Sequence, residues 1–160
     1  MEYNRAILDI FAIFNSSSVN YLIVGGTAVA YYGYSRKSTN NAGKATNKPD
    51  LDFWYNPSYE NYFKLLNALE QLGKDVTEYR EDPSPDPKNS FFRLEFDDYT
   101  LDLLPRIKAP LKFNASFAKK NISQYEDIEI PFISLEDLIQ DKETFPRQKD
   151  INDIEHLRKF

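Results

Sequence analysis

Residues 21–30 of this chain read YLIVGGTAVA, and residues 49–54 read PDLDFW. The first stretch is a short apolar run that breaks at two glycines and then continues with the composition of a helix. The second stretch alternates in the manner of a strand, so the side chains of Asp50 and Asp52 project from the same face. A strand, a glycine turn, a helix and an acidic strand are therefore expected in this order.

Both features favour a particular ligand. Two adjacent carboxylates repel each other, and a purely structural strand has no reason to keep them together. A divalent cation provides such a reason, because hard cations take oxygen ligands. A glycine turn before a helix offers backbone N–H groups and the positive end of the helix dipole, which suit phosphate. The two features together predict magnesium-dependent chemistry on a nucleoside triphosphate.

The remaining patterns predict a small mixed sheet flanked by helices, in an α+β or α/β arrangement that ends in a pair of helices. Helical spacing of apolar residues predicts helices over residues 3–15, 27–32, 56–72, 134–144 and 148–159. Alternation predicts strands over residues 21–24, 51–54, 76–80, 91–96 and 99–104, with two or three more between 109 and 133. Residues 34–49 are rich in Ser, Thr, Asn and Lys and are predicted to form a long loop.

Details of two helices can also be predicted. Asn56, followed by a proline, is expected to cap the third helix. The buried face of that helix is predicted to consist of Tyr59, Tyr62, Phe63, Leu66 and Leu69. The buried stripe of the last helix is predicted to consist of Ile151, Ile154 and Leu157.

A third carboxylate lies in the predicted hairpin of residues 91–104. Within the second strand of this hairpin, Asp102 stands between two leucines. A carboxylate on a sheet interior is unfavourable unless it is paired or bound to a metal. Asp102 is therefore the best candidate for a third metal ligand, and the alternative is an exposed residue on an edge strand.

These residues resemble the nucleotidyltransferase superfamily related to DNA polymerase β, including its small bacterial members and the nucleotidyltransferase-like toxins of toxin–antitoxin pairs. The resemblance spans roughly residues 20–158 and includes the C-terminal set Leu138, Ile139, Lys142, Arg147, Lys149, Asp150 and Asp153. Two features depart from the family pattern. Thr27 follows the glycines where a serine is often found, and the 24 positions from Gly26 to Asp50 (50 − 26) exceed the gap of small members.

The resemblance implies a role for each matching residue. Asp50, Asp52 and Asp102 would be catalytic and would hold Mg²⁺, with two ions expected. Residues of the glycine turn would bind the phosphates through backbone N–H groups, with further contacts from two basic side chains; these nucleotide-binding residues are Gly25, Gly26, Thr27, Arg36 and Lys142. For Asp150 and Asp153 an ion-pair network that ties the last two helices to the sheet is favoured, and the role of Lys149 is left open.

Composition bounds the remaining possibilities. The 160 residues are expected to form one domain, with a core at about 20–133 and C-terminal helices at about 134–160. The chain contains no cysteine and one histidine, which argues against disulfides and a structural zinc site. No signal peptide is recognisable and no apolar run approaches the ~20 residues of a membrane span, so a cytoplasmic location without a membrane partner is expected. The net charge of −5 argues weakly against duplex nucleic acid as a partner.

The resulting hypothesis is transfer of a nucleoside monophosphate from a nucleoside triphosphate to a hydroxyl acceptor. RNA, a protein side chain and a small molecule such as an aminoglycoside all remain open as acceptors, and a second subunit is an option for holding part of the acceptor. The alternative hypothesis is a non-catalytic nucleotidyltransferase-like module that acts through a protein partner, such as a toxin–antitoxin component. A P-loop kinase or hydrolase is disfavoured, because the chain has no Gly-x-x-x-x-Gly-Lys-Ser/Thr motif.

Overall fold

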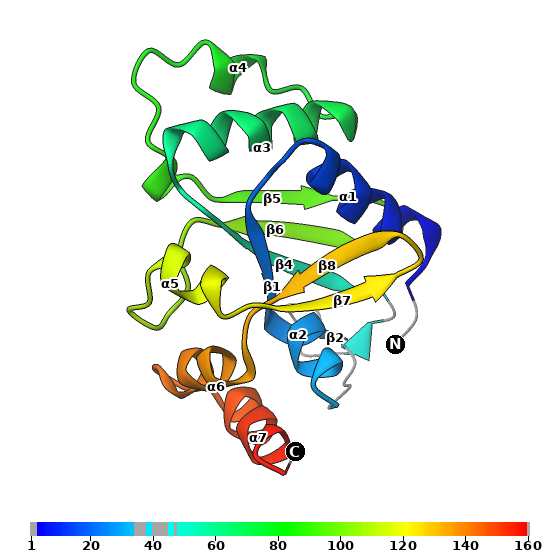
Figure 1. Ribbon diagram of the computed structural model, residues 1–160, viewed down its shortest axis with the longest axis vertical. Coiled ribbons are helices and arrows are strands. Elements are labelled where there is room, and N and C mark those ends of the chain that lie inside the picture. The colour runs from blue at the N-terminus through cyan, green and yellow to red at the C-terminus, as the bar shows by residue number, and fades with distance from the viewer. Residues whose placement is uncertain (1–2, 34–37, 40–44, 47, 160) are drawn as a thin grey trace.

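A six-stranded mixed sheet forms the centre of the computed structural model, which describes residues 3–33, 38–39, 45–46 and 48–159 (Figure 1). The strands lie in the order β5-β6-β4-β1-β8-β7. Their bounds are Tyr21–Val24 for β1, Asp50–Tyr55 for β4, Phe92–Glu95 for β5, Thr100–Leu104 for β6, Asn121–Tyr125 for β7 and Ile128–Phe132 for β8. The predicted α+β class with a small mixed sheet is confirmed.

Antiparallel hairpins form the two edges of this sheet. Strands β5 and β6 form one hairpin and β7 and β8 form the other. In the centre, β4 runs antiparallel to β1, whereas β6 is parallel to β4 and β8 is parallel to β1. Strand β4 is therefore enclosed between β1 and β6, and it is the strand that carries the paired aspartates.

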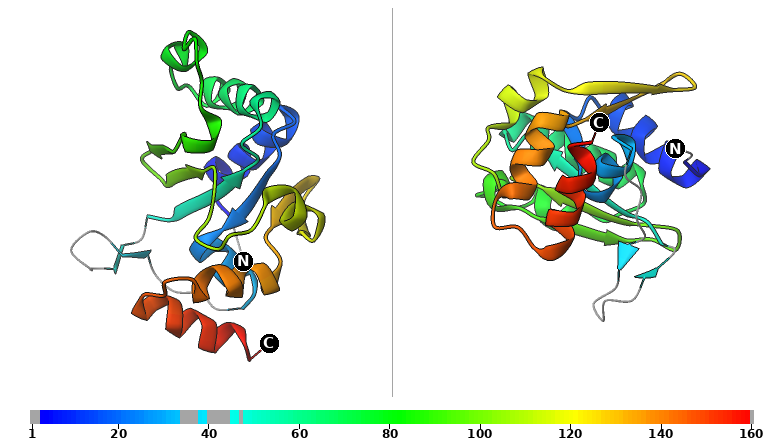
Figure 2. Two further views of the ribbon diagram at one scale, coloured as in Figure 1. Left: turned by 90° about the vertical axis from the view of Figure 1, so that its left-hand side faces the viewer. Right: turned by 90° about the horizontal axis from the view of Figure 1, so that it is seen from below.

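Helices cover the sheet and extend beyond one end of it. Their bounds are Arg5–Ser16 for α1, Gly25–Tyr31 for α2, Tyr59–Gln71 for α3, Thr77–Arg80 for α4, Phe113–Ala118 for α5, Leu135–Glu143 for α6 and Gln148–Leu157 for α7, with a 3₁₀ turn at Pro87–Asn89. Helices α6 and α7 lie side by side at the end of the molecule opposite α3 (Figures 1 and 2). No helix in the described ranges is both long and apolar enough to cross a membrane.

An aromatic cluster packs against the strands that carry the candidate site. Phe53 of β4 stacks on Tyr21 of β1 at 4.9 Å between ring centroids and on Phe11 of α1 at 5.8 Å. Phe14 of α1 meets Phe53 edge to face at 5.3 Å. All four rings are buried, and such aromatic pairs add to the free energy of area burial. Because Phe53 follows Asp52 directly, strand alternation directs the Phe53 ring into the core and the Asp52 side chain to the opposite face of the sheet.

The third helix begins later than predicted. Ser58, not Asn56, is its N-cap, since the Ser58 side chain accepts a hydrogen bond from the backbone N–H of Asn61. The Asn56 carbonyl instead accepts a hydrogen bond from the Asn61 side chain at 2.8 Å. Tyr59 and Phe63 are exposed, contrary to the prediction, because the face that packs on the core is centred on Tyr62, Leu65, Leu66 and Leu69. Tyr62, Leu66 and Leu69 are buried as expected, and they are joined by Leu65 and Ala68.

Three further predictions of local structure need correction. Residues 77–80 form the short helix α4 rather than a strand, because the Asp75 side chain accepts the N–H of Thr77 and starts a helical turn. The segment 109–133 contains helix α5 in addition to two strands. Ile151 of α7 is exposed, so the buried stripe of this helix keeps only Ile154 and Leu157 of the predicted set.

The predicted loop of residues 34–49 is described only in part. Two short strands, β2 at Ser38–Thr39 and β3 at Ala45–Thr46, pair antiparallel within it. The prediction of a continuous irregular loop is therefore wrong at these residues. Arg36 lies outside the described residues, so its predicted contact with the nucleotide stays a prediction.

Candidate active site

Strand pairing brings the predicted carboxylates together. Strands β4 and β6 are parallel neighbours, and their register places Asp52 beside Asp102. The Asp52 and Asp102 side chains are hydrogen-bonded to each other. Asp50 is two residues before Asp52 on the same strand, and it raises the pKa of Asp52 by charge repulsion. All three predicted metal ligands therefore face one space, and Asp102 is on an internal strand rather than at a sheet edge.

The shared space is electrostatically unfavourable for three carboxylates. Burial, followed by the charge of Asp102, the hydrogen bond with Asp102 and the charge of Asp50, raises the pKa of Asp52 to about 7. The ammonium of Lys142 opposes this rise. A carboxyl group with a pKa near neutrality signals excess negative charge in its surroundings. Binding of a proton or a cation therefore stabilises such a site.

Arg93 already relieves part of this charge. The Nη1 atom of Arg93 donates hydrogen bonds to both Asp102 oxygens, at 3.1 Å to Oδ1 and 2.9 Å to Oδ2. The contact follows from strand register, because Arg93 of β5 is paired with Asp102 of β6. Asp102 thus contacts a carboxyl group from one neighbouring strand and a guanidinium from the other.

The donor chemistry suits magnesium, although the side chains are not yet arranged around an ion. Carboxylate oxygens are the ligands that Mg²⁺ takes from proteins, and the raised pKa of Asp52 shows that this space favours added positive charge. Within the described residues, no group of three or more acidic, histidine or cysteine side chains is positioned to hold a metal ion. The fit is therefore chemical, and it requires Asp102 to exchange its contacts with Asp52 and Arg93 for an ion.

Gly25 is the residue of the glycine turn that contacts the carboxylates. Its φ of +68° is in the left-handed region, and a Cβ atom built on it would lie 2.2 Å from Oδ2 of Asp52. Two independent reasons therefore require glycine here, namely backbone conformation and the close approach of a carboxylate. The sequence pattern identified this turn correctly, but the close partner is Asp52.

Replacing Gly25 by Ala is accordingly expected to distort the site and destabilise the fold. The new methyl group must displace Asp52, and the positive φ adds strain of about 1–3 kcal/mol. The expected fall in Tm is roughly 3–9 °C by thermal unfolding, with loss of any magnesium-dependent stabilisation by nucleotide. Gly73→Ala is the matched control, because Gly73 has a φ of +91° but a methyl group added to it would meet no atom within 4 Å. Nucleotide binding that survives in Gly25→Ala would contradict the assigned contact.

The other two residues of the turn contribute less to this space. The Thr27 hydroxyl donates a hydrogen bond to the backbone carbonyl of Asp50 at 3.4 Å. This contact ties α2 to the start of β4 and gives Thr27 a structural role. Gly25 lines the cavity beside the carboxylates, whereas Gly26 and Thr27 are not among its lining residues in the described chain. Their predicted contacts with phosphate remain predictions.

The cavity that the carboxylates line has a volume of about 890 Å³ and lies between the sheet and the C-terminal helices. Its basic residues come from β5, from the segment after β6 and from the C-terminal helices, and they are Arg93, Arg106, Lys108, Lys142, Arg147 and Lys149. Its acidic residues are Asp50, Asp52, Asp102, Asp141 and Asp150, and its larger apolar residues are Val24, Phe91, Leu104, Ile107 and Phe145. The cavity is thus acidic on β4 and β6 and mainly basic elsewhere, in a chain whose net charge is −5.

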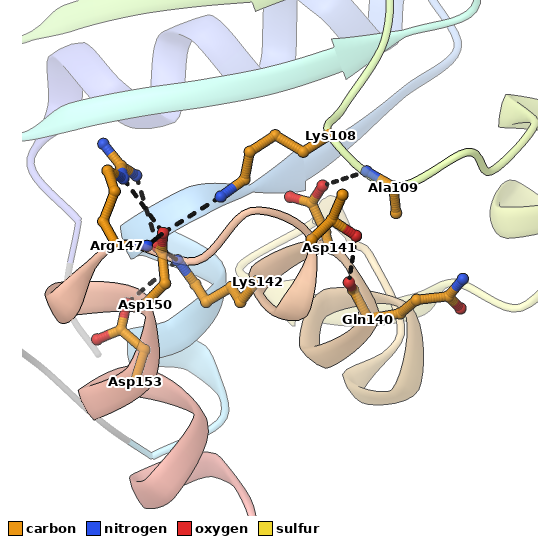
Figure 3. A network of polar contacts seen from close by, with 9 residues as sticks. Lys108, Ala109, Gln140, Asp141, Lys142, Arg147, Asp150 and Asp153 are labelled. Carbon is orange, nitrogen blue, oxygen red and sulfur yellow. Dashed lines mark hydrogen bonds and ion pairs between the residues drawn. The ribbon is translucent and has the colours of Figure 1, made fainter.

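An ion-pair network organises the basic side of the cavity (Figure 3). Lys142 of α6 contacts Asp150 at 3.3 Å and Asp153 at 3.1 Å, both on α7. Asp150 also accepts from Lys108 at 3.2 Å and from the backbone and side chain of Arg147. Burial by itself raises the pKa of Asp150, but the hydrogen bonds from Arg147 and Lys108 and the charge of Lys142 hold that pKa well below its usual range.

This network agrees with the structural role predicted for Asp150 and Asp153. Lys142 belongs to it and also lines the cavity, so its predicted contact with nucleotide remains untested. The segment that follows β6 is held by the same helices, since the backbone N–H of Ala109 donates to the Asp141 side chain at 2.9 Å (Figure 3). The network therefore fixes Lys108 and Arg147 in the wall of the cavity.

Sequence reasoning missed several residues of the cavity. Arg93 had a usable signal, because alternation within the predicted hairpin put it on the face opposite the apolar residues. Phe91 had the same signal, because it shares the face of Arg93 in the predicted strand of residues 91–96. Lys108 and Phe145 had none, since they lie in irregular segments whose position depends on the packing of distant elements. Lys149, whose role the sequence left open, is in the cavity lining.

Comparison with known proteins supports the fold. The sequence matches no protein-family model and no curated protein. Solved structures similar to this one include the lincosamide antibiotic adenylyltransferase LnuA in its lincomycin-bound form, at 18% identity and a TM-score of 0.60, over 98% of this chain and 96% of that one. The antibiotic-resistance factor ANT(2'')-Ia matches at 17% identity and a TM-score of 0.53, over 98% and 85% of the two chains.

A third similar structure is an antigenic nucleotidyltransferase-like protein from Paracoccidioides brasiliensis. It matches at 15% identity and a TM-score of 0.50, over 95% of this chain and 73% of that one. The class that these comparisons define is the nucleotidyltransferase fold, as the glycine turn and the aspartates predicted. At these identities the likeness concerns the fold.

Proposed function

We propose that this protein is a metal-dependent nucleotidyltransferase that moves a nucleoside monophosphate from a nucleoside triphosphate to an acceptor hydroxyl. The observation that carries the proposal is the convergence of Asp50, Asp52 and Asp102 on one cavity, with the pKa of Asp52 raised to about 7. The nucleotidyltransferase fold of the chain, shared over nearly its whole length with an adenylyltransferase, supports the same activity.

The carboxylates and the basic residues have separate roles in this proposal. Asp50, Asp52 and Asp102 would hold Mg²⁺, which when bound supplies charge stabilisation to the attacking and leaving oxygens of an in-line displacement. Asp102 would also help to remove the proton of the acceptor hydroxyl, whose oxygen would bond to the α-phosphate as pyrophosphate leaves. The backbone N–H groups at Gly25 and Gly26 and the basic residues opposite would bind the phosphates, because fixed positive charge in a cavity favours an anion strongly.

The cavity favours a small molecule as the acceptor. Its volume of about 890 Å³ is within the usual range for sites that bind small ligands. One protein of similar fold is a lincosamide antibiotic adenylyltransferase. Hydroxyl-bearing small molecules, including antibiotics, are therefore the first acceptors to test, with RNA and protein as the alternatives.

Thermal unfolding with each nucleoside triphosphate, with and without Mg²⁺, tests the nucleotide site. Ligand at about a hundred times its dissociation constant adds roughly 2.7 kcal/mol, which corresponds to about 5–10 °C in Tm for a chain of this size. The shift should require Mg²⁺, should vanish in Asp50→Asn and Asp102→Asn, and should persist in Asp97→Asn, a control in the exposed turn between β5 and β6.

Transfer itself is tested with labelled nucleoside triphosphate and separate panels of small molecules, RNA and protein. We expect the label to be transferred to a small molecule and the transfer to require Mg²⁺. A wild-type protein that shows no shift with any nucleotide would refute the enzyme proposal. The alternative, a non-catalytic module acting through a protein partner, would then be tested by co-purification.

A further inference from the structure

Phe145 is the most exposed large apolar side chain of the described residues, with 85% of its surface accessible. It lies in the connection between α6 and α7, directly before Pro146, and it lines the cavity. Its backbone φ is +48°, in the left-handed region. Few bulky residues adopt this conformation, and glycine or asparagine would adopt it with less strain.

Both properties of Phe145 oppose folding. An exposed phenylalanine side chain contributes little to the stability of the fold, because it is not buried. Its left-handed backbone conformation lowers the stability further through strain. The connection therefore derives no stability from having phenylalanine at this position. Strained residues that contribute nothing to the fold are concentrated at ligand sites, where the ligand supplies the missing contact.

The surroundings of Phe145 indicate which ligand this is. Lys142 lies three residues before it, Arg147 and Lys149 follow it by two and four residues, and all three cationic side chains line the same cavity as the ring. A polyanion held by these cations would carry any attached ring system toward Phe145. The second exposed aromatic residue of the cavity, Phe91, already has the Arg106 guanidinium over its ring at 4.9 Å. Phe145 is thus the more accessible of the two rings.

We propose that the Phe145 ring is the stacking platform for the nucleobase of the bound nucleoside triphosphate. This inference rests on the proposed function, because it assumes that the phosphates lie between the aspartates and the basic residues of the cavity. Stacking uses the π-face that every base has, so the platform by itself accepts purines and pyrimidines alike. Base selectivity, where present, must come from other contacts.

Binding of nucleoside triphosphate and of inorganic tripolyphosphate, each measured by calorimetry with Mg²⁺, separates the base from the phosphates. Phe145→Ala should weaken nucleoside triphosphate binding about tenfold, as expected for one lost stacking contact, and leave tripolyphosphate binding unchanged. Tyr59→Ala removes an aromatic ring that is 62% exposed outside the cavity and should change neither affinity. Phe145→Tyr should retain wild-type binding.

A second variant distinguishes a binding role from a structural one. Phe145→Gly should raise Tm by about 2–4 °C, because it releases backbone strain. The same variant should lose nucleoside triphosphate affinity as Phe145→Ala does. A structural role for the ring predicts the opposite sign for Tm.

Failure of this inference and failure of the proposed function give different results. If wild type binds nucleoside triphosphate and Phe145→Ala binds it equally well, the platform is wrong and the proposed function stands. Parallel losses of tripolyphosphate and nucleoside triphosphate affinity would also refute the platform, since a stacking residue does not act on phosphate. If wild type binds neither ligand, the nucleotide site and the platform are both refuted.

Discussion

Asp52→Asn is expected to stabilise the ligand-free protein at pH 8 and to abolish its magnesium-dependent response to nucleotide. In the folded protein the pKa of Asp52 is raised from 3.8 to about 7, first by burial and then by Asp102 and Asp50. Ionised Asp52 therefore destabilises the fold at pH 8, by on the order of 4 kcal/mol. Asparagine removes the charge and keeps a donor for the hydrogen bond with Asp102.

The pH dependence of this gain has a defined sign. Below about pH 3 the carboxyl group is protonated in both the folded and the unfolded state, so wild type and Asp52→Asn should differ little. As the pH rises from about 4 to about 7, the unfolded chain loses the proton while the folded one keeps it, and the penalty grows. Above pH 7 the penalty is complete and the difference between the two proteins is constant.

Urea unfolding of both proteins between pH 4.5 and 8 measures the difference. The gain of Asp52→Asn should increase across this range, and Asp97→Asn should show no such trend, because Asp97 is exposed. A variant less stable than wild type at pH 8 would mean that Asp52 is ionised and compensated in the ligand-free state. Magnesium ions should bind wild type more tightly at pH 8 than at pH 6, since a bound ion must displace the proton.

The part of the site that could be predicted from sequence is the part that local periodicity determines. Alternation places Asp50 and Asp52 on one face of a strand, and two glycines after an apolar run mark a turn. The hairpin pattern likewise put Asp102 on the face opposite its leucines. These predictions need only the geometry of a single strand or turn.

The contacts between these pieces could not be predicted in the same way. Asp52 meets Asp102 because β4 and β6 pair in parallel with a particular register, and the two residues are separated by the whole of α3, α4 and β5. No local pattern reports that register. The error at residues 77–80 has a similar origin, since one side-chain hydrogen bond from Asp75 decides a segment too short for periodicity to assign.

The Arg93 contact depends both on local sequence pattern and on the pairing of two strands. Once the β5–β6 hairpin is given, its register puts Arg93 beside Asp102, and a guanidinium there compensates one of three clustered carboxylates. The remaining excess charge is reflected in the raised pKa of Asp52. The ligand-free protein thus keeps an unfavourable arrangement of charge that a bound cation would relieve, as is common where stability and activity conflict.

Lys142→Met is expected to be strongly destabilising. The Lys142 side chain is only 8% exposed, and it contacts Asp150 and Asp153, whose side chains are 1% and 0% exposed. Removing one partner from a buried ion pair leaves charge uncompensated and costs about 3–5 kcal/mol. Asp150 keeps its contacts with Lys108 and Arg147, so the lower end of this range is expected. By thermal unfolding, Tm should fall by roughly 6–12 °C.

The matched control is Lys64→Met, which removes a lysine from an exposed pair with Glu60 on α3. Surface pairs of this kind contribute about 0–1 kcal/mol, so Tm should change by at most a few degrees. A similarly small change in Lys142→Met would contradict the view that Lys142 holds α6 and α7 together.

A double mutant separates the structural role of Lys142 from its predicted contact with nucleotide. Lys142→Met combined with Asp153→Asn removes a buried cation and a buried anion together, so part of the lost stability should return, as a favourable coupling energy in a double-mutant cycle. If Lys142 acts only between the helices, nucleotide affinity should return with stability. If Lys142 also binds phosphate, the double mutant will be stable but will still bind nucleoside triphosphate weakly. The second outcome is expected, because Lys142 lines the cavity and its charge acts on Asp52.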